Sequence, residues 1–210
     1  EKAMGGPPLK NAYFWRLYAR SNEVTGEPLW ACALWDQFSV HAIHEGILPP
    51  GGPELASLYH HMALLLGQMD DINRSWETRE FKGHFTSFDA EYRGQPEFIR
   101  DAFQHAERPA EEPFYFISPG RLYELACRVD PVSENYFMWF SWARKTARSW
   151  KEIDPVAISW HEAIPGDIRP LMYLTRSTEK RHALKKALGY LNEAEALDRL
   201  NPEVKQARKR

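Results

Sequence analysis

The sequence predicts an all-α protein, and three observations support that expectation. Long segments carry apolar residues at helical spacing, as in Leu55, Leu58, Met62 and Leu66, where steps of three and four residues keep to one helix face. Glycine and proline gather between these segments, at residues 5–8, 49–53, 94–96 and 109–113. Strand signals are nearly absent, since 114–117 is the only short β-like run and prolines bracket it.

Prolines mark several of the expected helix starts, because the first turn of a helix tolerates a residue without a backbone N–H. The prolines in such places are Pro28, Pro53, Pro96, Pro155 and Pro170. Asp130 and Asp154 each precede a proline, where they can act as caps or stops. Residues 70–92 can form one long helix, whose aromatic side chains recur every three to five residues.

The composition argues against several classes of protein. With 43% hydrophobic and 27% charged residues, the chain can bury a sizeable core and is not expected to be disordered. A net charge of −2 gives no basic excess, so direct contact with nucleic acid is not expected, and the short basic run at 206–210 reads as a solvated helix face. No apolar run approaches the roughly 18 residues that a membrane-spanning helix needs.

The cysteines and the chain ends give two further expectations. Cys32 and Cys127 are too few for a disulfide framework, which favours a reducing, cytoplasmic location. The chain begins at Glu1 without a methionine, and residues 200–207 look like the start of another helix. A segment of a longer protein, or a subunit of a larger complex, fits these features.

Residues of similar kind recur at intervals of 34 positions. Small or large packing residues recur in three series: Ala126, Trp160 and Ala194; Tyr123, Ala157 and Leu191; Phe103, Phe137 and Leu171. A fixed period of this length is typical of a helix–turn–helix unit that stacks on its neighbours, because one pair of helices leaves an apolar face open and the next pair covers it.

This period and pattern resemble the tetratricopeptide (TPR) repeat family. The best match is the unit with Leu171, Leu174, Thr175, Ala187, Leu191 and Ala194 at the pattern positions, although Arg199 stands where the pattern has proline. The resemblance implies a right-handed superhelical solenoid of antiparallel helix pairs, with about five degenerate repeats in a single domain, 1–210. The expected repeats are approximately 12–45, 53–86, 100–133, 134–167 and 168–201, and residues 43–52 and 86–99 break the phase.

The resemblance also implies a function, which is to bind a peptide or partner protein in the concave groove lined by the first helix of each unit. The side chains expected to contact this partner are Tyr13, Arg16, Arg20, His61, Asn135, Met138, Trp142, Lys145, Arg169 and Arg176. Arginine pairs with carboxylates, while tryptophan and methionine supply adaptable apolar area. For each side chain in this list, packing between repeats is the alternative role. No catalytic residue, metal site or cofactor is expected.

Two other functions stay open at this stage. His41, His44 and Glu45 share a predicted helix, and His60 and His61 follow on the next, so a compact helical enzyme could use them as a metal site.

The second alternative is the related HAT repeat of RNA-processing scaffolds. Its first helix has features like Trp15, Tyr18 and Glu23 of this chain.

Overall fold

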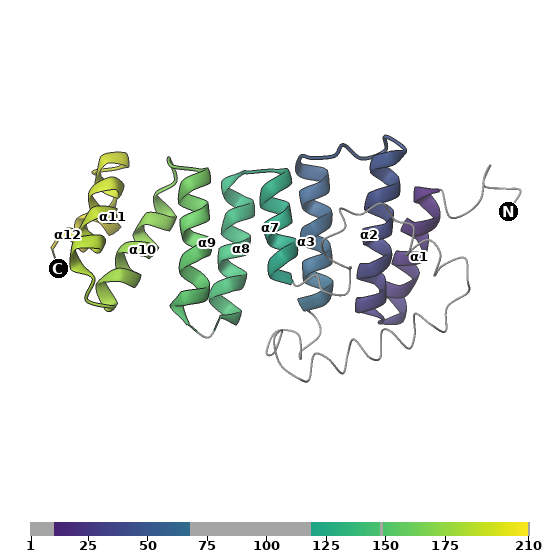
Figure 1. Cartoon of the computed structure of the whole chain (residues 1–210), viewed down its shortest axis with the longest axis horizontal. Coiled ribbons are helices and arrows are strands. Elements are labelled where there is room, and N and C mark those ends of the chain that lie inside the picture. The colour runs from purple at the N-terminus through teal and green to yellow at the C-terminus, as the bar shows by residue number, and fades with distance from the viewer. Residues whose placement is uncertain (1–10, 68–118, 148, 210) are drawn as a thin grey trace, which may run out of the picture. The chain divides into compact units, whose positions relative to one another are not determined.

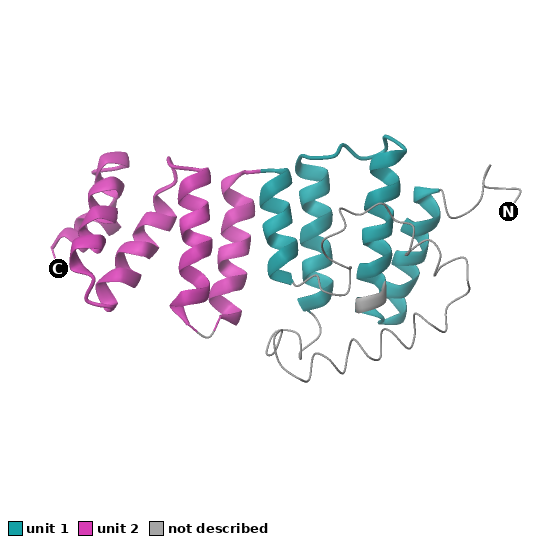
Figure 2. Ribbon diagram, in the orientation of Figure 1, with its two compact units in different colours: residues 1–130 teal, residues 131–210 magenta. Residues whose placement is uncertain are grey.

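The computed structural model describes residues 11–67, 119–147 and 149–209. These described residues form nine α-helices and no strand, which confirms the all-α class (Figure 1). They fall into two compact units, residues 1–130 and 131–210 (Figure 2). The long helix expected over 70–92, the β-like run at 114–117 and the helix start at Pro96 lie outside the described residues.

The first unit contains the four helices α1 (Ala12–Thr25), α2 (Pro28–His44), α3 (Pro53–Gly67) and α7 (Pro119–Val129). Neighbours in this series pack on each other: α1 on α2, α2 on α3, and α3 on α7 (Figure 1). The starts of α2 at Pro28 and of α3 at Pro53 confirm two of the proline-marked boundaries.

The turn between α1 and α2 is only two residues long. Gly26 ends α1 in the left-handed region, with φ of 82°, which a residue with a side chain adopts only at a cost. The N–H of Glu27 then donates to the carbonyl of Asn22 at 2.9 Å. This tight reversal lays the two helices side by side, and Trp15, Ala19 and Ala31 are completely buried.

The second unit contains α8 (Ser133–Thr146), α9 (Trp150–Ala163), α10 (Ile168–Lys180), α11 (Leu184–Leu197) and α12 (Pro202–Arg208). Each packs on the next, from α8 on α9 to α11 on α12, with the closest association between α10 and α11. The ends of α8 and α10, at residues 146 and 180, are 34 positions apart, and so are the ends of α9 and α11, at 163 and 197. The spacing of 34 residues that the sequence predicts is therefore the spacing between successive helix pairs in this unit.

Most of the periodic positions are buried as a packing role requires. Ala126, Trp160 and Ala194 are completely buried, and Tyr123, Ala157 and Leu191 are at most 6% exposed. Small residues allow helix axes to approach, while large ones fill the space between them.

Two expectations about this unit are wrong. Phe137 is 46% exposed rather than buried, although its ring lies beside that of the completely buried Trp160. Pro155 lies inside α9, five residues after its start, because the helix begins at Trp150. Asp154 consequently does not cap a helix but lies buried within α9.

No helix among the described residues is long and apolar enough to cross a membrane.

Candidate functional site

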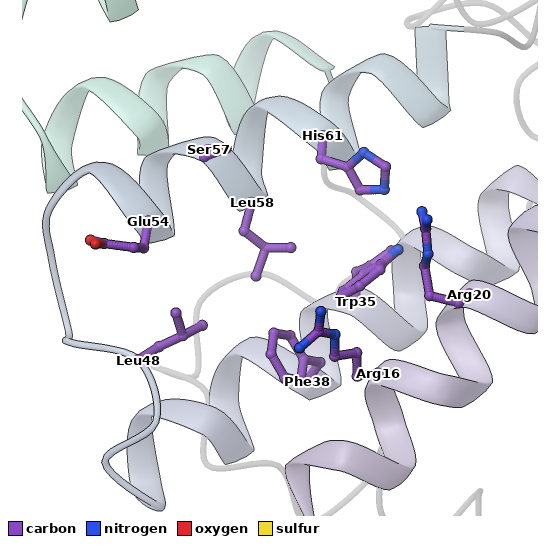
Figure 3. A pocket seen from close by; sticks show the side chains of 9 residues that line it. All are labelled: Arg16, Arg20, Trp35, Phe38, Leu48, Glu54, Ser57, Leu58 and His61. Atoms are coloured by element: carbon purple, nitrogen blue, oxygen red, sulfur yellow. The ribbon is translucent and has the colours of Figure 1, made fainter.

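An open groove of about 470 Å³ lies on the first unit, bounded by α1, α2 and α3. Its lining residues are Arg16, Arg20, Trp35, Phe38, Leu48, Glu54, Ser57, Leu58 and His61, and we refer to it as the α1–α3 groove. Figure 3 shows an apolar middle, with Arg20 and His61 at one end and Glu54 at the other.

The arginines of the groove are positioned by the way α1 is anchored. Asn11 begins the helix by accepting a hydrogen bond from the N–H of Tyr13 at 2.9 Å. Trp15 and Ala19 are completely buried, so the residues that follow each of them, Arg16 and Arg20, project to the side of the helix. Both are exposed, four positions apart, and therefore neighbours on one face.

Arg16 differs from Arg20 in its bonding. Arg20 donates through Nη1 to Glu23 at 2.6 Å, although its side chain is 62% exposed. Arg16 makes no hydrogen bond and no ion pair within the described part of the chain. Its guanidinium therefore keeps its donors for water or for a ligand.

The apolar middle of the groove comes from α2, α3 and the segment between them. Trp35 and Phe38 of α2 pack edge to face, with ring centroids 5.4 Å apart, and each is less than 10% exposed. Leu58 lies on α3, and Leu48 lies in the segment that joins α2 to α3. That segment is held to the end of α2 because the N–H of Leu48 donates to the carbonyl of Ala42 at 3.0 Å.

One end of the groove is organised by the carboxylate of Glu23. Glu23 accepts hydrogen bonds from Arg20 of its own helix, from the indole N–H of Trp35 on α2, and from Nε2 of His61 on α3. The His61 ring also meets the Trp35 ring edge to face, at 5.5 Å between centroids. A single carboxylate thus joins three helices at this end.

The surroundings of Glu23 favour its charged form. Burial acts to raise the pKa of this carboxyl group, but the hydrogen bonds from His61, Trp35 and Arg20 and the electrostatic effect of His61 outweigh burial and hold the pKa below its ordinary value. The carboxylate therefore remains ionised at neutral pH and balances the charge of Arg20, with which it forms an ion pair.

The structure brings together three of the residues that the sequence singled out. Arg16, Arg20 and His61 line the α1–α3 groove, while Tyr13 is 57% exposed and does not line it. Glu54 was missed, although it occupies the same position in the second expected repeat as Tyr13 does in the first. Leu48 carried no such signal, because it belongs to an irregular connection outside the repeat pattern.

In the second unit, Asn135 is only 7% exposed and Met138 and Trp142 are half-buried, whereas Lys145 is exposed. The buried side chain of Asn135 leaves little area for a partner. Lys145 alone of these four α8 residues is fully available at the surface.

The two arginines of α10 are engaged with other parts of the second unit. Arg169 forms an ion pair with Asp167 at 2.7 Å, and its guanidinium lies 4.8 Å from the centroid of the Trp160 ring. Arg176 forms an ion pair with Glu203 of α12 at 3.1 Å. Both side chains remain about half exposed, at 44% and 48%, so partner contact stays a prediction for each of them.

The residues of the suggested metal site do not form a group of ligands that could hold a metal in the described part of the chain. The His41 ring stacks on Trp15, with centroids 5.7 Å apart, and Glu45 accepts a hydrogen bond from the N–H of Ala12 at 2.8 Å. The His60 ring lies beside Tyr123, and burial lowers the pKa of both His41 and His60. No group of three or more potential ligands that could hold a metal occurs in the described ranges.

Neither models of known protein families nor curated proteins give a match to this chain.

Proposed function

We propose that this protein is an interaction scaffold, and that the α1–α3 groove binds a segment of a partner protein. The proposal depends on one observation: the groove combines an apolar middle with Arg16, whose side chain makes no hydrogen bond or ion pair within the described residues. Leu48, Leu58 and Phe38 offer apolar contact area, and Arg16 offers guanidinium donors at its border (Figure 3). Aromatic, aliphatic and arginine side chains of this kind supply most of the binding energy at protein interfaces.

The helix pairs support a more specific proposal for the architecture, in which each unit is a stretch of a TPR-like solenoid. The 34-residue helix-pair period of the second unit favours this, as do the completely buried small residues Ala126 and Ala194. In such an arrangement the first helices of successive pairs, α1 and α3, line the binding face. The groove on the first unit lies between these two helices.

One further feature fits an interaction protein working in a reducing compartment such as the cytoplasm. Cys32 and Cys127 are both buried free thiols, with no disulfide between them.

A selection from a random peptide library tests the proposal, with the full chain as bait. We expect wild-type protein to enrich peptides that Leu58→Asp fails to bind, because the aspartate places a charge in the apolar floor. Leu64→Asp is the matched control, since Leu64 lies on the same helix, is 55% exposed and does not line the groove.

A second blocking variant is needed because a folding defect in Leu58→Asp would also abolish binding. Ser57 is exposed, so Ser57→Trp can fill the groove without replacing a packed side chain. If enriched peptides bind wild type and both blocking variants equally well, the α1–α3 groove is not the binding site.

A further inference from the structure

We infer that the α1–α3 groove selects partner segments by the order of their charges, taking an acidic side chain beside Arg16 and Arg20, an apolar side chain in the middle, and a basic side chain beside Glu54. This inference rests on the proposed function and names the chemistry of the partner. It depends on how the charges are distributed along the groove.

The charges are separated by the apolar middle. Figure 3 shows Glu54 at one end and Arg20 at the opposite end, with Leu48 and Leu58 between them. Glu54 is exposed, in the first turn of α3, and makes no hydrogen bond or ion pair within the described ranges. The groove therefore has a free carboxylate at one end and a free guanidinium, that of Arg16, towards the other.

The cationic end keeps its character although Glu23 lies in it. The side chain of Glu23 is 11% exposed, and both of its carboxylate oxygens already accept hydrogen bonds, from Trp35, His61 and Arg20. Arg20 uses Nη1 for this contact and remains 62% exposed, so its other donors face solvent. With Arg16 added, the accessible groups at this end are predominantly hydrogen-bond donors.

The distance between the ends sets the length of the partner segment. Glu54 and His61 are seven residues apart on α3, and a helix rises about 1.5 Å per residue, so they are separated by about 10 Å along the groove. An extended strand advances about 3.3 Å per residue and directs alternate side chains to one face. The partner therefore carries its acidic, apolar and basic residues at alternate positions, which places the two charges four residues, or about 13 Å, apart, within reach of the long arginine and glutamate side chains.

Charge order can be separated from overall charge in this groove. The double variant Arg16→Glu/Glu54→Lys exchanges the two charged groups that make no ion pair within the described ranges and leaves the net charge unchanged, while Arg20 keeps its ion pair with Glu23. A partner attracted only by net charge would not distinguish the double variant from wild type. A partner that aligns with the groove's polarity would prefer one over the other.

The experiment measures two capped peptides that differ only in charge order, derived from a peptide selected on wild type. In the second peptide the acidic and basic residues are exchanged around the same apolar residue. We expect wild type to bind the selected peptide about tenfold more tightly than the exchanged one, and the double variant to show the opposite preference, because each exposed pair contributes a factor of roughly two to five. Added salt should reduce both preferences.

The control is Glu27→Lys, which changes the net charge at an exposed residue of the same unit that does not line the groove. It should leave the preference of wild type intact. If wild type and the double variant prefer the same peptide, or if neither distinguishes the two, the charge-order inference is overturned.

The measurements distinguish a failure of the charge-order inference from a failure of the proposed function. Equal binding of both peptides that is still abolished by Leu58→Asp would leave the groove as a binding site and remove only its charge order. Binding that Leu58→Asp and Ser57→Trp leave unchanged would remove the groove itself.

Discussion

Nε2 of His61 on α3 lies 2.5 Å from Oε1 of Glu23 on α1, although 38 positions separate the two residues in sequence. The same carboxylate oxygen accepts the indole N–H of Trp35 on α2. Three helices are thus tied together at one end of the α1–α3 groove by a side chain that is only 11% exposed. This contact both stabilises the first unit and fixes the position of a groove wall.

Glu23→Gln should destabilise the protein. Glutamine keeps the shape of the side chain but removes the charge that Arg20 and His61 contact, and hydrogen bonds to charged groups are stronger than those between neutral ones. We expect the free energy of unfolding, measured by urea denaturation, to fall by about 1–2 kcal/mol. Glu27→Gln is the control, because Glu27 is exposed and forms no side-chain cap. An equal loss in both variants would contradict the role given to Glu23.

The stability contributed by Glu23 should depend on pH. Because its pKa in the folded protein lies below the ordinary value of 4.5, the unfolded chain binds the proton more readily. The contribution is therefore fully present above about pH 5 and is lost as the pH falls through the lowered folded-state value. The difference in unfolding free energy between wild type and Glu23→Gln should be constant near neutrality and shrink in acid. A difference that grows in acid would show the opposite sign of the shift.

The helix pairs of this protein were predictable from sequence because they depend on local periodicity. The 34-residue spacing of Ala126, Trp160 and Ala194 reflects positions that must pack in every pair, and all three are completely buried. Pro155 misled the placement of α9, because proline is favoured in a first turn, whereas its observed place inside the helix costs a backbone hydrogen bond. The packing of α9 against α8 and α10 overrides that local preference, and a single sequence does not show such packing.

The groove was predictable only in part. Arg16, Arg20 and His61 follow from the expected repeat register, and all three line the α1–α3 groove. Leu48 and the convergence of Glu23 with Trp35 depend instead on how an irregular connection and three helices meet in space. Such contacts have no period, and a single sequence therefore does not show them.

Arg181→Ala should destabilise the second unit more than the loss of an exposed ion pair would. Nη2 of Arg181 lies 2.5 Å from Oδ2 of the buried Asp154, and its guanidinium lies 3.8 Å from the centroid of the Trp150 ring. Removing it leaves the buried carboxylate of Asp154 without its cationic partner, although the Ser177 hydroxyl still donates to it at 2.8 Å, so we expect a loss of about 2–3 kcal/mol.

The matched control for Arg181 is Arg176→Ala. Arg176 lies on α10, and both it and its partner Glu203 are about half exposed, so its loss should cost less than about 1 kcal/mol. Chemical denaturation of both variants gives the comparison. A double-mutant cycle with Asp154→Asn should show coupling between Arg181 and Asp154, and strict additivity would contradict a direct interaction.

Cys127 should resist alkylation while the protein is folded. Burial, assisted by the charge of Glu124, raises the pKa of this thiol to about 12, and the residue is only 2% exposed. At about pH 8 only roughly one molecule in ten thousand then carries the reactive thiolate. In a Cys32→Ser variant, where Cys127 is the only cysteine, mass spectrometry should detect slow reaction with iodoacetamide in buffer and fast reaction in guanidinium. Equal rates in the two conditions would show that the thiol is accessible.

Ala194→Leu should be strongly destabilising, because Ala194 is completely buried in a cluster with Leu171, Leu191 and Val204, where α10, α11 and α12 meet. A leucine there adds volume to a filled core and forces the helices apart, which costs about 1–3 kcal/mol. Ala196→Leu provides the control, since Ala196 lies two positions along the same helix and is exposed. The same chemical change should then be nearly neutral in urea denaturation. Comparable losses at the two positions would mean that the small residue at the 34-residue interval is not a packing requirement, and the periodic packing of the helix pairs would lose its physical basis.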